Sequence, residues 1–457
     1  MPRAGLLVVA TLLPAALTFG CGPRVPEEPE VAPDAAADVE PVTAQAAGTV
    51  PSASAASAPL TSEPDDPQAI ARLEAAGFTV TLNDAGQVTA AQAGLSPLKD
   101  ADLAPLAGLA HLEVLRVRGN DVTDRGLEHL RGLVRLTTLE LENTAVTDFG
   151  LAVLADLPAL KVLNIRRANI TDQALEHVRN VATLEQLILL YNNVSDEGLA
   201  LIKDMPQLRL LDLRGCFMVS DYGLEHLRSL TGLRAFKIRS PQVTDAGLEP
   251  ISTLTNLRSL VLEDTGITNA GAAHLSHLTE LTELILMRTL VGDEGLAHLA
   301  GLTKLERLSL RDTPTGSAGV AHLSGLTALR LLDLDETHVG DAGLAHLAGM
   351  TRLETLNLWH TQVSDAGLAH LAPLTSLKSL DLKDTQVTDA GLAQLGGLTN
   401  LHTLVLEQNA ISDEGLAHLE GLTNLRALNL KLTDVTGTGV EQLKQKLPHV
   451  EVQYDVH

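Results

Sequence analysis

The sequence predicts an α/β solenoid, in which each repeat adds one short strand to a curved parallel sheet and one short helix to the opposite face. Three observations lead to this prediction. The chain of 457 residues copies itself every 24 residues from Leu112 onward. Each copy has an L-x-x-L-x-L spacing, typical of a turn followed by a strand. Each copy then has leucines three residues apart, which form one apolar helical stripe. A fixed period of this length indicates an array of stacked units.

The repeats are counted from their leading leucines, and 14 are clear. They are Leu112, Leu136, Leu160, Leu184, Leu208, Leu233, Leu257, Leu281, Leu305, Leu329, Leu353, Leu377, Leu401 and Leu425. One extra residue near Cys216 lengthens a single repeat. A degenerate unit starts at Val88, and a closing strand is expected over residues 450–454. The predicted array therefore spans residues 88–457.

The unit LETLNLWHTQVSDAGLAHLAPLTS, residues 353–376, shows the expected local structure. The strand leucines are Leu353, Leu356 and Leu358, and the helix leucines are Leu368, Leu371 and Leu374. Ser364 and Asp365 form an N-cap pair before the helix. Gly367 indicates close backbone packing, since glycine costs about 1 kcal/mol in a helix relative to alanine. Strands pack about 4.8 Å apart and helices about 8–10 Å apart, so the sheet must form the inner, concave face.

These repeats resemble the leucine-rich repeat family, and the step VTDAGL at residues 387–392 looks like its F-box-associated and bacterial effector types. The resemblance covers residues 88–457 and implies a leucine-rich-repeat solenoid. It also implies recognition of proteins on the concave face, because family members are mostly binding scaffolds. The family's usual asparagine after the strand is mostly threonine here, as at Thr385. Nothing upstream resembles an F-box, so a ubiquitin-ligase adaptor role is not expected.

The N-terminal 20 residues predict an export signal. Arg3 supplies a positive charge, and residues 4–20 are apolar but short for a membrane span. Gly20-Cys21 resembles the end of a bacterial lipoprotein signal, in which the cysteine is lipidated. Simple secretion and an uncleaved anchor are the alternatives. We therefore expect an exported protein of the cell envelope that reaches the membrane only through this terminus.

Between the signal and the array, two segments are expected. Residues 21–65 are rich in Ala, Pro and acidic residues and contain no aromatic residue, which predicts a disordered tether. Residues 66–87 predict a cap made of a helix and a hairpin. Asp66 is the expected N-cap, Pro67 the first helical residue, and Gly77 follows the helix.

The net charge is −24, which argues against nucleic acid as a partner, because such binding needs a basic surface. The chain has only two cysteines, Cys21 and Cys216, too few for a disulfide framework. Aromatic residues make up 2% of the chain, so we expect a core of aliphatic layers. These features predict a protein or peptide partner and a monomeric chain.

A column of histidines recurs in the helices, with His298, His346 and His370 in the repeated GLAHL. One histidine per repeat spreads the rings along a line, whereas a metal site needs three or four converging ligands. We expect structural side chains here, with adventitious Ni²⁺ or Zn²⁺ binding as the alternative. The recurring aspartates are expected at helix N-termini. No catalytic or phosphate-binding motif is present in the sequence, so we expect no enzyme activity, no metal and no cofactor.

The strand positions between the leucines vary and face the concave side, so they are the candidate contacts. Basic residues dominate the N-terminal half of this face and acidic residues the C-terminal half. Tyr and Trp are enriched in interface hot spots. The predicted contact residues are Arg116, Arg166, Ile188, Leu190, Tyr191, Arg214, Lys237, Met287, Asp333, Asp335, Trp359 and His360. The alternative is a generic solvated sheet with scattered apolar side chains.

The sequence thus favours a non-enzymatic recognition scaffold of the bacterial envelope that binds a protein or peptide on its concave face. A structural or self-associating envelope spacer is the first alternative. The substrate-reading part of an enzyme system is the second.

Overall fold

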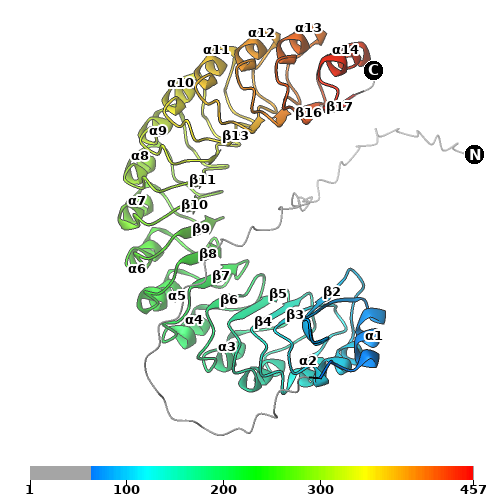
Figure 1. Ribbon diagram of the computed structural model, residues 1–457. Coiled ribbons are helices and arrows are strands. Elements are labelled where there is room, and N and C mark those ends of the chain that lie inside the picture. The colour runs from blue at the N-terminus through cyan, green and yellow to red at the C-terminus, as the bar shows by residue number, and fades with distance from the viewer. Residues whose placement is uncertain (1–62, 456–457) are drawn as a thin grey trace, which may run out of the picture. The chain divides into compact units, whose positions relative to one another are not determined.

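The computed structural model describes residues 63–455, which lie within one compact unit, Ser57–His457. These residues form the predicted α/β leucine-rich-repeat solenoid, with strands on the inner side of the curved array and helices on the outer side (Figure 1). The predicted signal, Cys21 and most of the tether lie outside the described residues. Within the described part, no helix combines the length and apolar character needed to cross a bilayer.

The sheet contains 17 strands in the described residues. They are β1 (Phe78–Leu82), β2 (Val88–Ala93), β3 (Val114–Arg118), β4 (Thr138–Glu142), β5 (Val162–Arg166), β6 (Gln186–Ile188), β7 (Leu210–Arg214), β8 (Ala235–Arg239), β9 (Ser259–Glu263), β10 (Glu283–Ile285), β11 (Arg307–Ser309), β12 (Leu331–Asp333), β13 (Thr355–Asn357), β14 (Ser379–Asp381), β15 (Thr403–Val405), β16 (Ala427–Leu430) and β17 (Glu451–Tyr454).

The outer side carries α-helices and 3₁₀-helices. The α-helices are α1 (Pro67–Ala75), α2 (Asp124–Leu127), α3 (Asp172–Val178), α4 (Asp196–Ile202), α5 (Asp221–Glu225), α6 (Leu248–Ile251), α7 (Asn269–Ala272), α8 (Asp293–Leu296), α9 (Ser317–His322), α10 (Asp341–Leu344), α11 (Asp365–Leu368), α12 (Asp389–Leu392), α13 (Asp413–Leu416) and α14 (Gly437–Lys446). The 3₁₀-helices are Asp100–Gly108, Glu128–Leu130, Gly150–Asp156, His226–Ser229, Asp245–Gly247, Ala273–His277, Ala297–Leu299, Ala345–Leu347, Ala369–Leu371, Ala393–Leu395 and Ala417–Leu419.

Pairing follows the repeat register. Equivalent residues of neighbouring strands align, as Leu356 does with Leu332 and Leu380. From β2 to β17, each strand pairs in parallel with the next strand along the chain. Strand β1 pairs antiparallel with β2. Helix α1 packs on β1 and covers the N-terminal end of the array, with Asp66 accepting a hydrogen bond from the Gln68 N–H. The helix-hairpin cap therefore closes the first layer of the core.

The core is the stack of repeat leucines, all nearly inaccessible to solvent. In the unit that begins at Leu353, the predicted single helix divides into α11 and a 3₁₀ turn, Ala369–Leu371. Leu374 lies beyond both and is still buried. A 3₁₀-helix has three residues per turn, so leucines three apart align in it better than in an α-helix. The expectation of one helix through Leu374 was wrong for this reason.

The recurring aspartates join consecutive repeats in addition to starting the helices. The carboxylate of Asp341 accepts hydrogen bonds from the N–H and the Oγ–H of Ser364 in the next repeat, at 2.8 and 2.6 Å. Equivalent pairs begin with Asp100 and end with Asp413. The sequence revealed the helix-start position, whereas this bond between repeats needed the structure.

Candidate functional site

The concave face is formed by the strand side chains that alternate with the core leucines. On β7, Leu211 and Leu213 enter the core, and Leu210, Asp212 and Arg214 face the other side. Most of the twelve predicted contact residues lie at these outward positions. Tyr191 and His360 instead occupy the next position along the chain, where the backbone has a positive φ of 55° and 51°. That conformation recurs in most repeats, so it belongs to the repeat geometry.

Seven of the twelve predicted contacts belong to two clusters in the structure. The first, here called the tyrosine patch, contains Tyr191, Arg166, Arg167, Arg214, Lys237 and Arg239. The guanidinium carbons of Arg166 and Arg167 lie 5.9 and 4.8 Å from the Tyr191 ring centroid. Arg239 Nη1 donates to the Tyr191 hydroxyl at 3.4 Å. One aromatic ring therefore organises three arginines, two from the repeat led by Leu160 and one from the repeat led by Leu233.

Gly215 creates the space for this ring. It has a φ of +80°, and a β-carbon placed on it would lie against the Tyr191 ring, 2.8 Å from Cε1. Gly215 and the buried Cys216 belong to the one repeat that is a residue longer than the others. The irregular repeat thus adjoins the aromatic residue that it accommodates.

The second cluster, here called the tryptophan patch, contains Trp359, His360, Arg311, Asp335 and Lys383. The Arg311 guanidinium carbon and Lys383 Nζ lie 5.4 and 5.1 Å from the Trp359 ring centroid. His360 Nδ1 is 2.5 Å from an oxygen of Asp384. The two patches are seven repeats apart, roughly 34 Å along the sheet at about 4.8 Å per strand. Tyr191 and Trp359 therefore do not form one anchor site.

Many charged side chains of the face form ion pairs between neighbouring repeats. Arg116 forms an ion pair with Glu140 at 2.9 Å, and Arg118 with Glu142 at 2.6 Å. In the C-terminal half, Lys383 pairs with Glu407 at 2.9 Å. The sequence-based description of the face left out these oppositely charged residues at equivalent positions of neighbouring repeats. Such residues are in register across the parallel sheet.

Carboxylates crowd the tryptophan patch. Burial is the largest effect on Asp335, which is 1% exposed, and it raises the pKa of that group to about 7 although Arg311 lies 3.0 Å away. Burial likewise raises the pKa values of Asp333 and Asp381 above their ordinary range. Water solvates the ionised carboxylates poorly at these buried positions, so the three aspartates are harder to ionise than exposed ones.

Several residues of both patches were absent from the sequence-based candidates. Arg167, Arg239, Arg311 and Lys383 occupy the same strand or turn positions as the chosen residues, so the repeat alignment contains the signal that identifies them. The role of Gly215 depends on the direction of the Tyr191 ring, which a sequence does not give. Of the predicted contacts, Ile188, Leu190 and Met287 are half-buried on the face.

The histidines line the outer side. His298, His322, His346, His370 and His418 are exposed, one in each repeat. In residues 63–455, no three His, Cys, Asp or Glu side chains gather in a way that could hold a metal ion.

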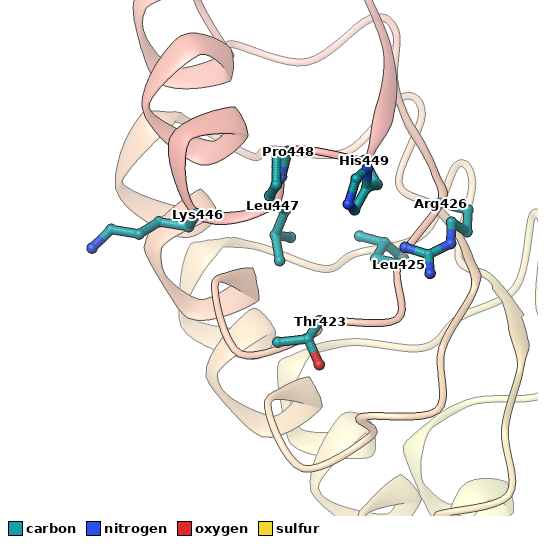
Figure 2. A pocket seen from close by; sticks show the side chains of 7 residues that line it. All are labelled: Thr423, Leu425, Arg426, Lys446, Leu447, Pro448 and His449. Carbon is teal, nitrogen blue, oxygen red and sulfur yellow. The ribbon is translucent and has the colours of Figure 1, made fainter.

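A small hollow of about 130 Å³ lies at the C-terminal end of the array, lined by Thr423, Arg426, Lys446 and His449 among others. Figure 2 shows that the Lys446 side chain extends away from the other lining side chains. Small-molecule sites usually have volumes of about 300–1,000 Å³. The hollow is therefore small for a ligand site and is remote from both patches.

The solenoid fold, with variable side chains on the face and mostly leucines in the core behind it, defines a repeat scaffold of the recognition class. The family model described as leucine-rich repeat region matches residues 192–450, and the leucine rich repeat model matches residues 108–130. The chain belongs to the leucine-rich repeat family. Its members typically mediate recognition between proteins, and the matched models describe repeats rather than an enzyme.

Solved structures agree with this assignment. An internalin (inlF) from Listeria monocytogenes is 25% identical, with a TM-score of 0.50, over 79% of this chain and 92% of the internalin. A leucine-rich repeat protein of Leptospira interrogans is 18% identical, with a TM-score of 0.53, over 76% of this chain and 86% of its own. The second similarity shows the fold alone. No curated protein matches the sequence.

Proposed function

We propose that this chain is a non-enzymatic recognition protein of the bacterial envelope that binds a protein or peptide on its concave face. The observation that carries the proposal is the placement of Tyr191 and Trp359. Each aromatic ring lies on the variable face among cationic side chains, although the core uses almost no aromatic residues. Aromatic and arginine side chains dominate the binding energy of protein interfaces.

The test uses the full chain immobilised as bait for an envelope extract, with captured proteins identified by mass spectrometry. We expect the double variant Tyr191→Ala, Trp359→Ala to lose the specific partner. The matched control is Phe149→Ala, Tyr222→Ala, which removes two aromatic rings that are 79% and 81% exposed near helix N-termini. Capture that is equal for the original chain and both variants contradicts binding through the concave aromatics.

Export and lipid anchoring belong to the same proposal. The support is the sequence around Cys21, which lies outside the described residues. Expression in a bacterial host with a labelled fatty acid should give a labelled, detergent-phase protein, and Cys21→Ala should abolish both properties. An unlabelled but exported chain would indicate simple secretion.

A self-associating spacer is the second candidate, because β17 ends the described sheet and has β16 as its neighbour. An open strand edge can pair with another chain. Sedimentation of the full chain over a hundredfold concentration range tests this candidate. A single monomeric species throughout contradicts self-association.

A further inference from the structure

We infer that the tyrosine patch binds an acidic segment of the partner protein or peptide. This inference rests on the proposed function, since it names the chemistry of the ligand at one part of the same face. The acidic peptide would lie on the surface formed by Tyr191, Arg166, Arg167, Arg214, Lys237 and Arg239.

The first support is the local charge. The tyrosine patch contributes five cationic side chains, and Arg288 lies next to it through their shared carboxylate, Asp264. Among residues 63–455, four carboxylates interact with these six cations: Asp212, Glu263, Asp264 and Asp312. Counted over residues 63–455, the basic side chains of this region outnumber its carboxylates, although the net charge of the chain is −24. A local excess of the opposite sign guides a complementary partner and sets its position.

The second support is the pairing of individual arginines. Most arginines of the face contact a carboxylate, as Arg116 does. Among residues 63–455, no carboxylate lies within ion-pair distance of Arg166 or Arg167, and the buried Arg166 Nε has no hydrogen-bond acceptor. A buried donor without an acceptor is unfavourable, so a ligand that supplies an acceptor gains from satisfying it. Both side chains also reach solvent, so an incoming carboxylate can approach them.

The third support is preorganisation. Tyr191 holds Arg166 and Arg167 through its ring and Arg239 through its hydroxyl, and Gly215 fixes the position of the ring. Ordered guanidinium groups lose less side-chain entropy on binding, and their planar fork matches a carboxylate. The arrangement favours consecutive Asp or Glu side chains over a single anion. A nucleic acid is disfavoured because the rest of the chain repels a long polyanion.

The experiment measures the fluorescence anisotropy of a fluorescein-labelled decaglutamate peptide with the full chain at 50 and 200 mM salt. We expect saturable binding that weakens with salt. Arg166→Glu, Arg167→Glu should weaken it at least about tenfold, since the variant replaces two attractive charges at the interface by two repulsive ones. Neither substitution breaks an ion pair of the described residues, so we expect the fold to persist. Arg166→Gln, Arg167→Gln provides the same test if the charge reversal fails to fold.

The matched control is Arg258→Glu, Arg352→Glu, which makes the same change of charge at two exposed positions outside the face. We expect it to alter decaglutamate binding less than about twofold, since surface charges far from an interface are screened. Tyr191→Phe should weaken binding by several fold, because it removes the hydroxyl that positions Arg239.

The same experiment distinguishes an acidic peptide from other ligands of the patch. Equal binding of a decaserine peptide, or equal loss in the control variant, would overturn the inference. So would tighter binding of a single-stranded oligonucleotide than of decaglutamate. A further variant replaces the Asp and Glu residues between positions 27 and 40 by Asn and Gln. If decaglutamate binds only to this variant, the patch binds the chain's own acidic segment, and the inference of a partner's acidic segment is overturned. Partner capture that requires Tyr191 and Trp359 but tolerates Arg166→Glu, Arg167→Glu would overturn the inference and leave the proposed function standing.

Discussion

The carboxylate of Asp365 accepts two hydrogen bonds from Thr388 of the next repeat, one from the N–H at 2.7 Å and one from the Oγ–H at 2.6 Å. Thr388 in turn caps α12, because its hydroxyl accepts from the Ala390 N–H at 3.3 Å. Each aspartate thus fixes the residue that starts the following helix. This chain of contacts makes each helix start depend on the preceding repeat.

Removing one aspartate of this chain should destabilise the array. Asp365→Ala leaves two donors of Thr388 without an acceptor, so we expect a loss of about 2–4 kcal/mol in the free energy of unfolding. Asp365→Asn retains one acceptor, as Asn269 does for the Gly292 N–H, so about 1 kcal/mol is expected. Urea unfolding followed by circular dichroism measures both. The exposed Asp434→Ala is the control, and an equal effect there would contradict the assignment.

Gly391, two residues after Asp389, should not tolerate a methyl group. At Gly391, a β-carbon would collide with Asp365 Oδ1 and lie 3.1 Å from Asp365 Cα. Gly391→Ala should therefore cost about 1–3 kcal/mol through overpacking, although alanine is the better helix former. A β-carbon on Gly397 would have no neighbour within 4 Å. The Gly397→Ala variant should therefore have a melting temperature equal to or slightly above that of the original chain. A stabilised Gly391→Ala would show that the helices do not pack this closely.

In three consecutive repeats the N-cap residue is a glycine without a hydroxyl: Gly292, Gly316 and Gly340. A substitution at Gly316 can supply the missing hydroxyl. Gly316 has φ −116° and ψ −174°, close to the −122° and −175° of Ser364, and its N–H already donates to Asp293 at 2.6 Å. Gly316→Thr should add a hydroxyl donor to Asp293 and reduce the freedom of the unfolded chain. We expect a gain of about 1–2 kcal/mol in urea unfolding. Gly340→Thr should gain less, because its partner is Ser317 and its β-carbon would lie 3.3 Å from the Gln362 carbonyl oxygen.

Much of the fold was predictable because apolar residues that recur at the same position of every 24-residue repeat are the buried ones. Leu356 and Leu358 recur at spacings that only a stacked strand can use, and the registers agree with that count. The candidate face was less predictable. The outward position of Trp359 follows from strand alternation, but its contacts with Arg311 and Lys383 involve residues one or two repeats away. Side-chain direction decides those contacts, and the period carries no information about it.

The threonines after the strands replace the family's usual asparagine, and they divide into two kinds. The Thr361 hydroxyl donates to the Leu358 carbonyl at 2.7 Å, whereas the buried Thr265 hydroxyl has no partner among the described residues. Thr361→Val should cost about 1 kcal/mol, and Thr265→Val should be neutral or stabilising. Thermal unfolding of the two variants side by side measures the difference. Equal losses would show that both hydroxyls are bonded.

Asp335 should make stability depend on pH. Burial raises its folded pKa to about 7, above the 3.8 of an ordinary aspartate. Between these values the unfolded chain has lost the proton and the folded chain retains it, so the unfolded state binds fewer protons and folding stability falls as pH rises. Below pH 3.8 both states are protonated and the penalty is absent, whereas above pH 7 it is complete.

Asp335→Asn removes this titration while keeping a side chain of the same shape. We expect the variant to be more stable than the original chain at pH 8, by at least about 1 kcal/mol, since each unit of pKa difference corresponds to about 1.4 kcal/mol. At pH 4 the two proteins should unfold at nearly the same temperature. Melting temperatures at both pH values decide the matter. A variant that is less stable at pH 8 would mean that the ion pair with Arg311, at 3.0 Å, outweighs the burial of the carboxylate.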